Sequence, residues 1–255
     1  MSRLVNILFL MTLSVSCLYA GESNDINYLF GKGNEAYINK NYTESINQYE
    51  SIVASGFESG ALHYNLGNAY YRLGHIGKAI LNYERALKWL PNDENVIINL
   101  KLANLRVKDR IDAPPEFFLF RLYRNVVNLF SSRGWAIWVT LSAIVAALSF
   151  AVSWNLDPKK FRLLIRFIIY VSIVVFLVAI PQMVQRYKIE TGHDYGIIID
   201  YSVNSLAAPQ GGSTELFIVH EGSKVKILEQ DGNWYKIELI DGKQGWITAG
   251  GVGII

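Results

Sequence analysis

The sequence predicts a multidomain membrane protein in which an α-helical solenoid, two transmembrane helices and a small all-β barrel follow one another. Three observations predict this architecture. Motifs in the first part of the chain recur at a fixed spacing. Two long uncharged apolar runs follow, and the last part consists of short β-rich runs separated by turn signals.

Composition places the chain among membrane proteins rather than nucleic-acid binders. The 255 residues are 51% hydrophobic, and residues 113–193 carry nine Lys and Arg against three Asp and Glu. This positive excess lies in and beside the apolar runs, where it suits lipid headgroups. We therefore expect a lipid bilayer and no nucleic acid among the partners.

The first residues have the layout of a secretory signal peptide. A basic start at Arg3 precedes 18 uncharged residues from Leu4 to Gly21. We expect a signal peptide over residues 1–20, with cleavage after Ala20. Lipidation at Cys17 and retention of the leader as an anchor are the alternatives. Cys17 is the only cysteine, so cleavage leaves a chain without disulfides.

Residues 24–112 contain an internal repeat. Gly33-Asn34 recurs as Gly67-Asn68, and Tyr49 recurs as Tyr83 at the same spacing. A period of about 34 residues, with small residues where helices approach and Pro91 at a helix end, resembles the tetratricopeptide repeat. We expect two repeats, at about residues 26–59 and 60–93. A covering helix over residues 94–109 is expected to close the second repeat.

The resemblance to tetratricopeptide repeats implies a concave groove lined by the first helix of each pair. The groove residues are then Phe30, Asn34, Tyr37, Tyr64, Asn68, Tyr71 and Arg72. Asn34 and Asn68 occupy a position at which some relatives bind a peptide carboxylate. The alternative is that both are consensus residues satisfied within the repeat. The aromatic composition favours a groove for an apolar or aromatic peptide.

A linker and an amphipathic segment occupy residues 113–133. Pro114-Pro115 ends the solenoid, because proline blocks continuation of a helix. Aromatic residues interrupted by Arg121 and Arg124 then predict a helix lying along a membrane surface. Packing of this helix on the solenoid is the alternative.

Two apolar runs predict a transmembrane hairpin. There are 23 uncharged residues between Arg133 and Asp157, and 19 between Arg166 and Arg186. Each run can cross a hydrocarbon core of about 30 Å as a helix. We expect spans at 134–154 and 166–185. The basic loop at 155–165 is expected to be cytoplasmic by the positive-inside rule.

Residues 194–255 change to strand spacing. Turn signals such as Asp231-Gly232 and Asp241-Gly242 separate short β-rich runs. The succession of these runs with Trp234-Tyr235 and Gly245-Trp246 resembles a bacterial SH3 domain, which implies a small barrel. The resemblance recommends Trp234, Tyr235 and Trp246 as contact residues for cell-wall peptides or proteins. Packing roles in the barrel are the alternative for these side chains.

The sequence predicts a protein that is not an enzyme. His63, His75, His193 and His220 are scattered without metal-ligand spacing, and there is no phosphate loop and no nucleophile motif. No catalytic residue, cofactor-binding residue or metal site is therefore predicted.

The order of leader, repeats, hairpin and SH3-like domain resembles one family along nearly the whole chain. This is the BatE family of the Bacteroides aerotolerance (Bat) operon. The resemblance implies a bacterial inner-membrane scaffold with both soluble domains in the periplasm. It also implies von Willebrand factor A-type membrane proteins and other Bat proteins as partners, and a link to oxidative stress. An envelope protein that binds peptidoglycan through the SH3-like domain is the alternative.

Overall fold

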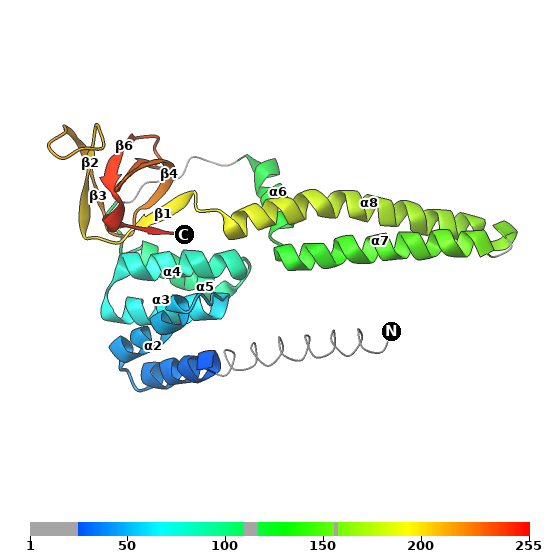
Figure 1. Ribbon diagram of the computed structural model, residues 1–255, viewed down its shortest axis with the longest axis horizontal. Helices are drawn as coiled ribbons and strands as arrows, with labels where there is room; N and C mark the ends of the chain where they lie inside the picture. Colours follow the sequence, from blue (N-terminus) through cyan, green and yellow to red (C-terminus); the bar gives the residue numbers. More distant parts are fainter. Residues whose placement is uncertain (1–24, 110–116, 156–157) are drawn as a thin grey trace, which may run out of the picture.

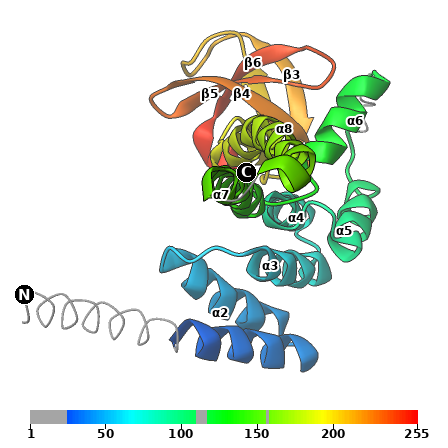
Figure 2. The same cartoon turned by 90° about the vertical axis from the view of Figure 1, so that its right-hand side faces the viewer.

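The computed structural model describes residues 25–109, 117–155 and 158–255. The expected signal peptide and the Pro114-Pro115 linker lie outside the described residues. Figure 1 shows a body of stacked helices and β-strands from which a long helical hairpin projects. In the view along the hairpin, the strands lie on one side of it and the stacked helices on the other (Figure 2).

Five helices form the stacked region. Residues 25–38 are helical, and the helices that follow are α2 (Tyr42–Ala54), α3 (Gly60–Leu73), α4 (Ile76–Trp89) and α5 (Glu94–Asn104). Polar side chains start α3 and α5, because Ser59 Oγ accepts from Leu62 N–H and Asp93 Oδ1 accepts from Val96 N–H. Gly74 ends α3 with a left-handed φ of 83°, a conformation that glycine adopts without steric cost.

Helix pairs in this region pack by the same contact in both repeats. Gly33 and Gly67 lie directly against the rings of Tyr49 and Tyr83, so closely that a Cβ at either glycine would fall within 3 Å of the ring. The absence of a side chain therefore sets the distance between the two helices of each pair. Helix α5 packs on α4 in the place of the first helix of a third unit.

The hairpin consists of α7 (Ser132–Asn155) and α8 (Pro158–Thr191), which pack along each other (Figure 1). Both helices are long and apolar enough to cross a membrane, over Ser132–Ser153 and Leu163–Thr191. Most of their apolar side chains are exposed. The start of α7 and the end of α8 lie together beside the stacked helices (Figure 1).

The connection within the hairpin is shorter than expected. Helix α8 begins at Pro158, so most of the predicted loop at 155–165 is helical. Proline fits the first turn of a helix, because its missing N–H would have no intrahelical acceptor there. The positions of charged residues indicate where an apolar span ends, but they do not indicate where the helix ends. Basic residues can continue the helix, because helical hydrogen bonds are made by the backbone.

Helix α6 (Phe118–Val127) lies beside the end of the hairpin, against α8 (Figures 1 and 2). Only Val127 in this helix is buried. Five neighbouring apolar side chains remain exposed, namely Phe118, Leu119, Phe120, Leu122 and Tyr123. These side chains are exposed beside the end of the hairpin, and the position of this helix on a membrane surface stays a prediction.

Seven strands form one antiparallel sheet in the order β3-β2-β6-β5-β4-β1-β7. The strands are β1 (Tyr195–Ile198), β2 (Ser202–Leu206), β3 (Glu215–His220), β4 (Lys224–Asp231), β5 (Trp234–Glu238), β6 (Gln244–Thr248) and β7 (Val252–Ile254). The prediction of a barrel is wrong, because the sheet is open: β3 pairs with β2 only, and β7 with β1 only. Alternation in the sequence predicts which face is buried and does not predict whether the edges meet.

The open sheet is nonetheless strongly curled. Strands β1 and β2 lie toward opposite ends of the strand order, yet only residues 199–201 connect them. The curl encloses an apolar core formed by Ile198, Val203, Val219, Val225, Ile237, Leu239, Ile247 and Val252. The stacked helices have a separate core that extends to Ile197 of β1 and to Ile255.

Gly67→Ala tests the helix contact within a repeat. The new Cβ would lie 2.8 Å from the Tyr83 ring. We expect a net destabilisation of about 1–2 kcal/mol, because overpacking outweighs the gain in helix propensity. The measurement is thermal unfolding followed by circular dichroism in detergent.

Gly31→Ala is the matched control, because its added Cβ would have no described atom within 4 Å apart from its chain neighbours and the backbone of its own helix. This change should stabilise the protein by about 0.5–1 kcal/mol. Effects of the same sign for the two variants would contradict the proposed packing.

Candidate functional site

The two groove asparagines are held by hydrogen bonds at equivalent places in the two repeats. Asn34 Oδ1 accepts from Tyr49 Oη at 2.7 Å and from Asn65 Nδ2 at 3.0 Å. Asn68 Oδ1 accepts from Tyr83 Oη and Asn99 Nδ2, both at 2.8 Å. A carbonyl oxygen has two lone pairs, so both acceptors are saturated. The amide N–H groups are what each asparagine can offer a ligand.

The predicted aromatic groove residues divide into packing and surface positions. Phe30 packs on Tyr49 with ring centroids 5.7 Å apart, and Tyr64 packs on Tyr83 at 6.3 Å. Phe30 and Tyr64 therefore join the two helices of their repeats, and both side chains are half-buried.

The other predicted groove residues make a second set of contacts, which is nearer to the protein surface. Arg72 is exposed, and its Nε donates to Tyr37 Oη at 3.3 Å. The Arg106 guanidinium lies 5.4 Å from the centroid of the Tyr71 ring. The part of the row available to a ligand is therefore a mixture of tyrosine and arginine, rather than purely aromatic.

The three SH3-like residues do not form one surface. Strands β5 and β6 pair Trp234 with Thr248 and Lys236 with Trp246, which puts the two tryptophans on the same face of the sheet. Tyr235 pairs with the buried Ile247 and packs against the apolar core on the opposite face. Trp234 and Trp246 remain candidates for contact, and Tyr235 supports the core.

The sheet is docked on the outer face of α4. Glycines lie at the closest approaches. A Cβ on Gly77 would lie 2.5 Å from Ile198 O, and one on Gly253 would lie 2.3 Å from a Leu81 methyl group. The Gly77 N–H donates to Glu221 Oε1 at 2.7 Å. The repeats and the sheet thus share a tightly packed interface.

Two basic side chains of α4 bind the end of the sheet. Arg85 donates to Ile254 O through Nε at 3.0 Å and Nη2 at 2.6 Å. Lys88 Nζ donates to Gly192 O at 2.6 Å and to Ile255 O at 3.0 Å. Burial, and then the neighbouring Arg85 charge, lower the pKa of Lys88. Both cations therefore act as structural links between the domains.

Asp109 forms a second polar link at the end of the solenoid. Its Oδ2 accepts from the His220 N–H at 2.7 Å and from Ser223 Oγ at 3.1 Å, and its Oδ1 lies 2.8 Å from His220 Nδ1. Burial alone would raise the pKa of Asp109, but the hydrogen bonds from His220 and Ser223 outweigh it and lower that pKa.

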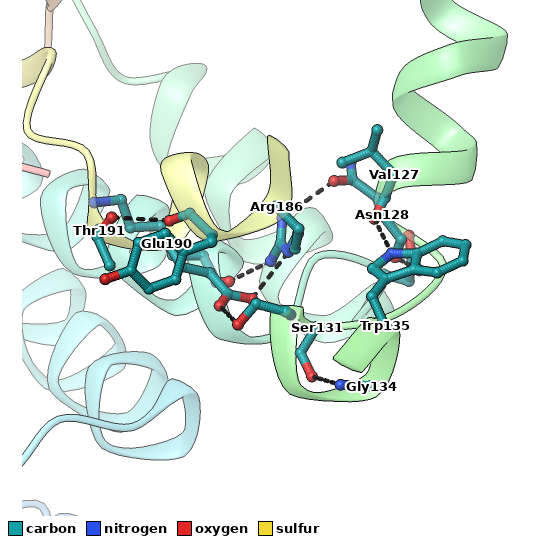
Figure 3. Close-up of polar contacts among 12 residues, drawn as sticks. Val127, Asn128, Ser131, Gly134, Trp135, Arg186, Glu190 and Thr191 are labelled. Carbon is teal, nitrogen blue, oxygen red and sulfur yellow. Dashed lines mark hydrogen bonds and ion pairs between the residues drawn. The ribbon is translucent and has the colours of Figure 1, made fainter. Parts of the chain in front are cut away.

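Arg186 joins the hairpin to the rest of the protein (Figure 3). It is only 1% exposed, although it is the first charged residue after the second apolar run. Its guanidinium donates to Asn128 Oδ1 at 3.1 Å, to Glu190 Oε1 at 3.1 Å and to Lys88 O. Glu190 in turn accepts from the Ser132 N–H at 3.0 Å and from the Ser132 hydroxyl. Arg186 and Glu190 together therefore connect α8 with α4, with the C-cap of α6 and with the start of α7.

The sequence contains only weak signals of these links. From the sequence alone, Arg186 and Lys88 would be predicted to be exposed surface charges, because no sequence pattern indicates that they lie close together. Apolar residues on two sides of α4, such as Leu81 and Tyr83, are the only indication that this helix has two covered faces. Within the described ranges, no three His, Cys, Asp or Glu residues are grouped so as to hold a metal ion.

Family comparisons identify two interaction modules. Residues 60–93 match the tetratricopeptide repeat family, and residues 205–253 match the bacterial SH3 domain family. A comparison with curated proteins finds no match. Tetratricopeptide repeats are protein-interaction modules, and bacterial SH3 domains bind peptidoglycan or proteins. Both are typically non-catalytic.

Acid should loosen the Asp109 link. A carboxyl group with a lowered folded-state pKa stabilises the fold above its ordinary value of 3.8, and this contribution is lost as the pH falls through the lowered value.

We expect Asp109→Asn to speed hydrogen exchange at the His220 amide at neutral pH. Mass spectrometry of exchanged peptides measures this.

Asp241→Asn is the control for the Asp109 variant, because Asp241 makes only an exposed turn contact with Lys243. Exchange at His220 should be unchanged in this variant. Equal acceleration in both variants would show that the Asp109 contact is not a specific link.

Arg186→Met should release the hairpin from α4. Removing one partner of a buried ion pair costs about 3–5 kcal/mol, because Glu190 keeps an uncompensated charge. We expect faster hydrogen exchange over residues 128–135 and 186–192, together with a lower unfolding temperature in detergent.

Lys188→Met is the matched control, since Lys188 is exposed and lies two residues along α8. It should leave both quantities unchanged. Adding Glu190→Gln to Arg186→Met should recover part of the lost stability. A double variant as unstable as Arg186→Met would argue against the unpaired charge as the cause.

Proposed function

We propose that this chain is a non-catalytic scaffold of a bacterial inner membrane. Its repeats and its SH3-like domain bind protein partners on the same side of the bilayer. The single observation that carries this proposal is the docking of both modules on each other at one end of an apolar hairpin. Two crossings return the chain to the side on which it started.

The geometry supports a scaffold in which the modules act together. Arg85 and Lys88 bind the sheet from one face of α4, while the opposite face of that helix packs on α3. The two modules are therefore held in one fixed arrangement relative to each other. We place both modules in the periplasm, because the basic residues near Pro158 suit a cytoplasmic turn.

The proposed setting is a Bat-type complex linked to aerotolerance or oxidative stress. The order of repeats, hairpin and SH3-like domain supports it. The proposed partners are von Willebrand factor A-type membrane proteins and other Bat proteins. The aerotolerance role is then indirect, exerted through assembly of the complex.

Peptidoglycan binding through the SH3-like domain is the second candidate function. It is favoured by the placement of Trp234 and Trp246 on one face of the sheet, away from the apolar core. Aromatic side chains on such a face offer flat apolar contacts to sugars and peptides.

Reporter fusions test the topology. A reporter active only outside the cytoplasm, fused after residue 112 or after residue 255, should be active in both positions. A fusion at residue 157 should be inactive. Activity at only one of the first two positions would eliminate the hairpin arrangement.

Crosslinking followed by affinity purification tests the scaffold function. We expect recovery of von Willebrand factor A-type proteins, reduced at least about tenfold by Tyr71→Ala with Arg72→Glu. Asn47→Ala, at an exposed position of α2, is the control. Full recovery by the groove variant would exclude the predicted row as the binding surface.

Sedimentation with purified cell wall tests the second candidate. The detergent-solubilised chain should co-sediment, and Trp234→Ala with Trp246→Ala should abolish this if peptidoglycan is the ligand. A chain that stays in the supernatant leaves the scaffold function as the remaining proposal.

A further inference from the structure

The solenoid ends on a helix whose packing face is not fully covered. In the second repeat, α4 covers α3 through specific contacts: Tyr83 packs on Tyr64 with tilted rings, lies against Gly67 and donates to Asn68. The first repeat uses the same contacts, one repeat length earlier in the chain. The face of the first helix is thus built to receive a second helix.

Helix α5 continues this series as the first helix of a third unit. One repeat length further along the chain, Ile98, Lys101 and Leu102 correspond to Tyr64, Gly67 and Asn68. The hydrogen bond from Asn99 Nδ2 to Asn68 Oδ1 repeats the one from Asn65 to Asn34, so the correspondence holds in space as well as in sequence.

No second helix packs on this face of α5 among the described residues. Ile98 is 53% exposed and Leu102 is 46% exposed. Large apolar side chains at this exposure on consecutive turns form a patch that a partner can cover.

The uncovered face of α5 is one wall of a groove of about 820 Å³. The docked sheet supplies the opposite wall through Gly222–Lys224 and Ile240, and α4 contributes Ile80 and Glu84. Val107 closes part of the groove by packing against Gly222. The groove therefore exists only because the sheet is docked on the solenoid.

We propose that this groove binds one amphipathic α-helix of a partner protein, which takes the place of the missing second helix of the third repeat. The proposal rests on the scaffold function and specifies how a partner is recognised. A helix is the occupant because a helix covers the equivalent face of α3 and of the helix over residues 25–38.

Four charged side chains line the groove, namely Glu84, Lys101, Asp109 and Lys224. Glu84 pairs with Lys224 at 2.8 Å and Asp109 Oδ1 lies 2.8 Å from His220 Nδ1, so Lys101 determines which helix fits.

Lys101 occupies the position that corresponds to Gly67, the residue that lies against the Tyr83 ring in the second repeat. An aromatic ring in the equivalent place of a partner helix would therefore face the side chain of a lysine. A carboxylate there can pair with Lys101, while apolar residues one turn away cover Ile98 and Leu102. The partner helix is thus apolar on one side with an acidic residue at its centre.

A peptide with the sequence of residues 76–91 and the change Tyr83→Glu is the probe. It carries the helix that covers α3, adapted to Lys101. Fluorescence anisotropy with the full chain in detergent should show saturable binding. Leu102→Asp should weaken binding at least about tenfold, because it places a charge on the apolar face. Ile38→Asp is the control, since Ile38 is an exposed apolar residue of the first helix.

Two further substitutions test whether binding depends on the helical conformation of the peptide and on its charge. Glu84→Pro in the peptide removes a hydrogen bond from the middle of its helix and should abolish binding. Lys101→Glu in the chain should reverse the preference, so that a peptide with Tyr83→Lys binds better than one with Tyr83→Glu.

Equal binding to the Leu102→Asp and Ile38→Asp chains would overturn the proposal, and so would equal binding of the proline peptide or no saturable binding. Self-association of the chain that is lost in Leu102→Asp would identify a second copy as the occupant and would also overturn it. Recovery of partners by crosslinking, unchanged by Leu102→Asp, would refute this groove while leaving the scaffold function intact.

Discussion

A buried guanidinium group holds the parts of this protein together. Arg186 is almost completely enclosed, and a charge in such a place is tolerated only when it is paired and hydrogen-bonded. Its partners come from the end of α4, the cap of α6 and the last turn of α8, and Glu190 extends the network to the start of α7. The direction of the hairpin relative to the helical repeats depends on this network.

Helix α4 transmits that arrangement to the sheet. Tyr83 faces α3, whereas Leu81, Arg85 and Lys88 face the strands or the end of the chain. Glycines at Gly77 and Gly253 let backbones approach where a side chain would collide. Because interiors are close-packed, one helix with two covered faces makes the repeats and the sheet a single unit. The groove beside α5 is a product of that unit and belongs to neither domain alone.

Elements with strong periodic signals could be predicted from the sequence. The regular recurrence of Gly-Asn and Tyr positions indicates the stacked helices, because local spacing determines which residues share a helix face. The uncharged runs indicate α7 and α8, because each run is long enough to form an apolar helix that crosses a membrane. The family matches confirm a tetratricopeptide repeat and a bacterial SH3 domain. The groove row stays a prediction, and the structure changes its chemistry: Asn34 and Asn68 have saturated oxygens, and Tyr235 belongs to the core.

The sequence by itself determined the order of the modules, the period of the repeats and the apolar character of the hairpin, because these depend on residues close together in the chain. Only the tertiary structure decided that the sheet stays open, that Arg186 is buried and that α5 presents an uncovered face to a groove. Each of these depends on residues that are far apart in the chain. Arg186 and Lys88 are 98 positions apart, and local patterns contain no information about such a contact.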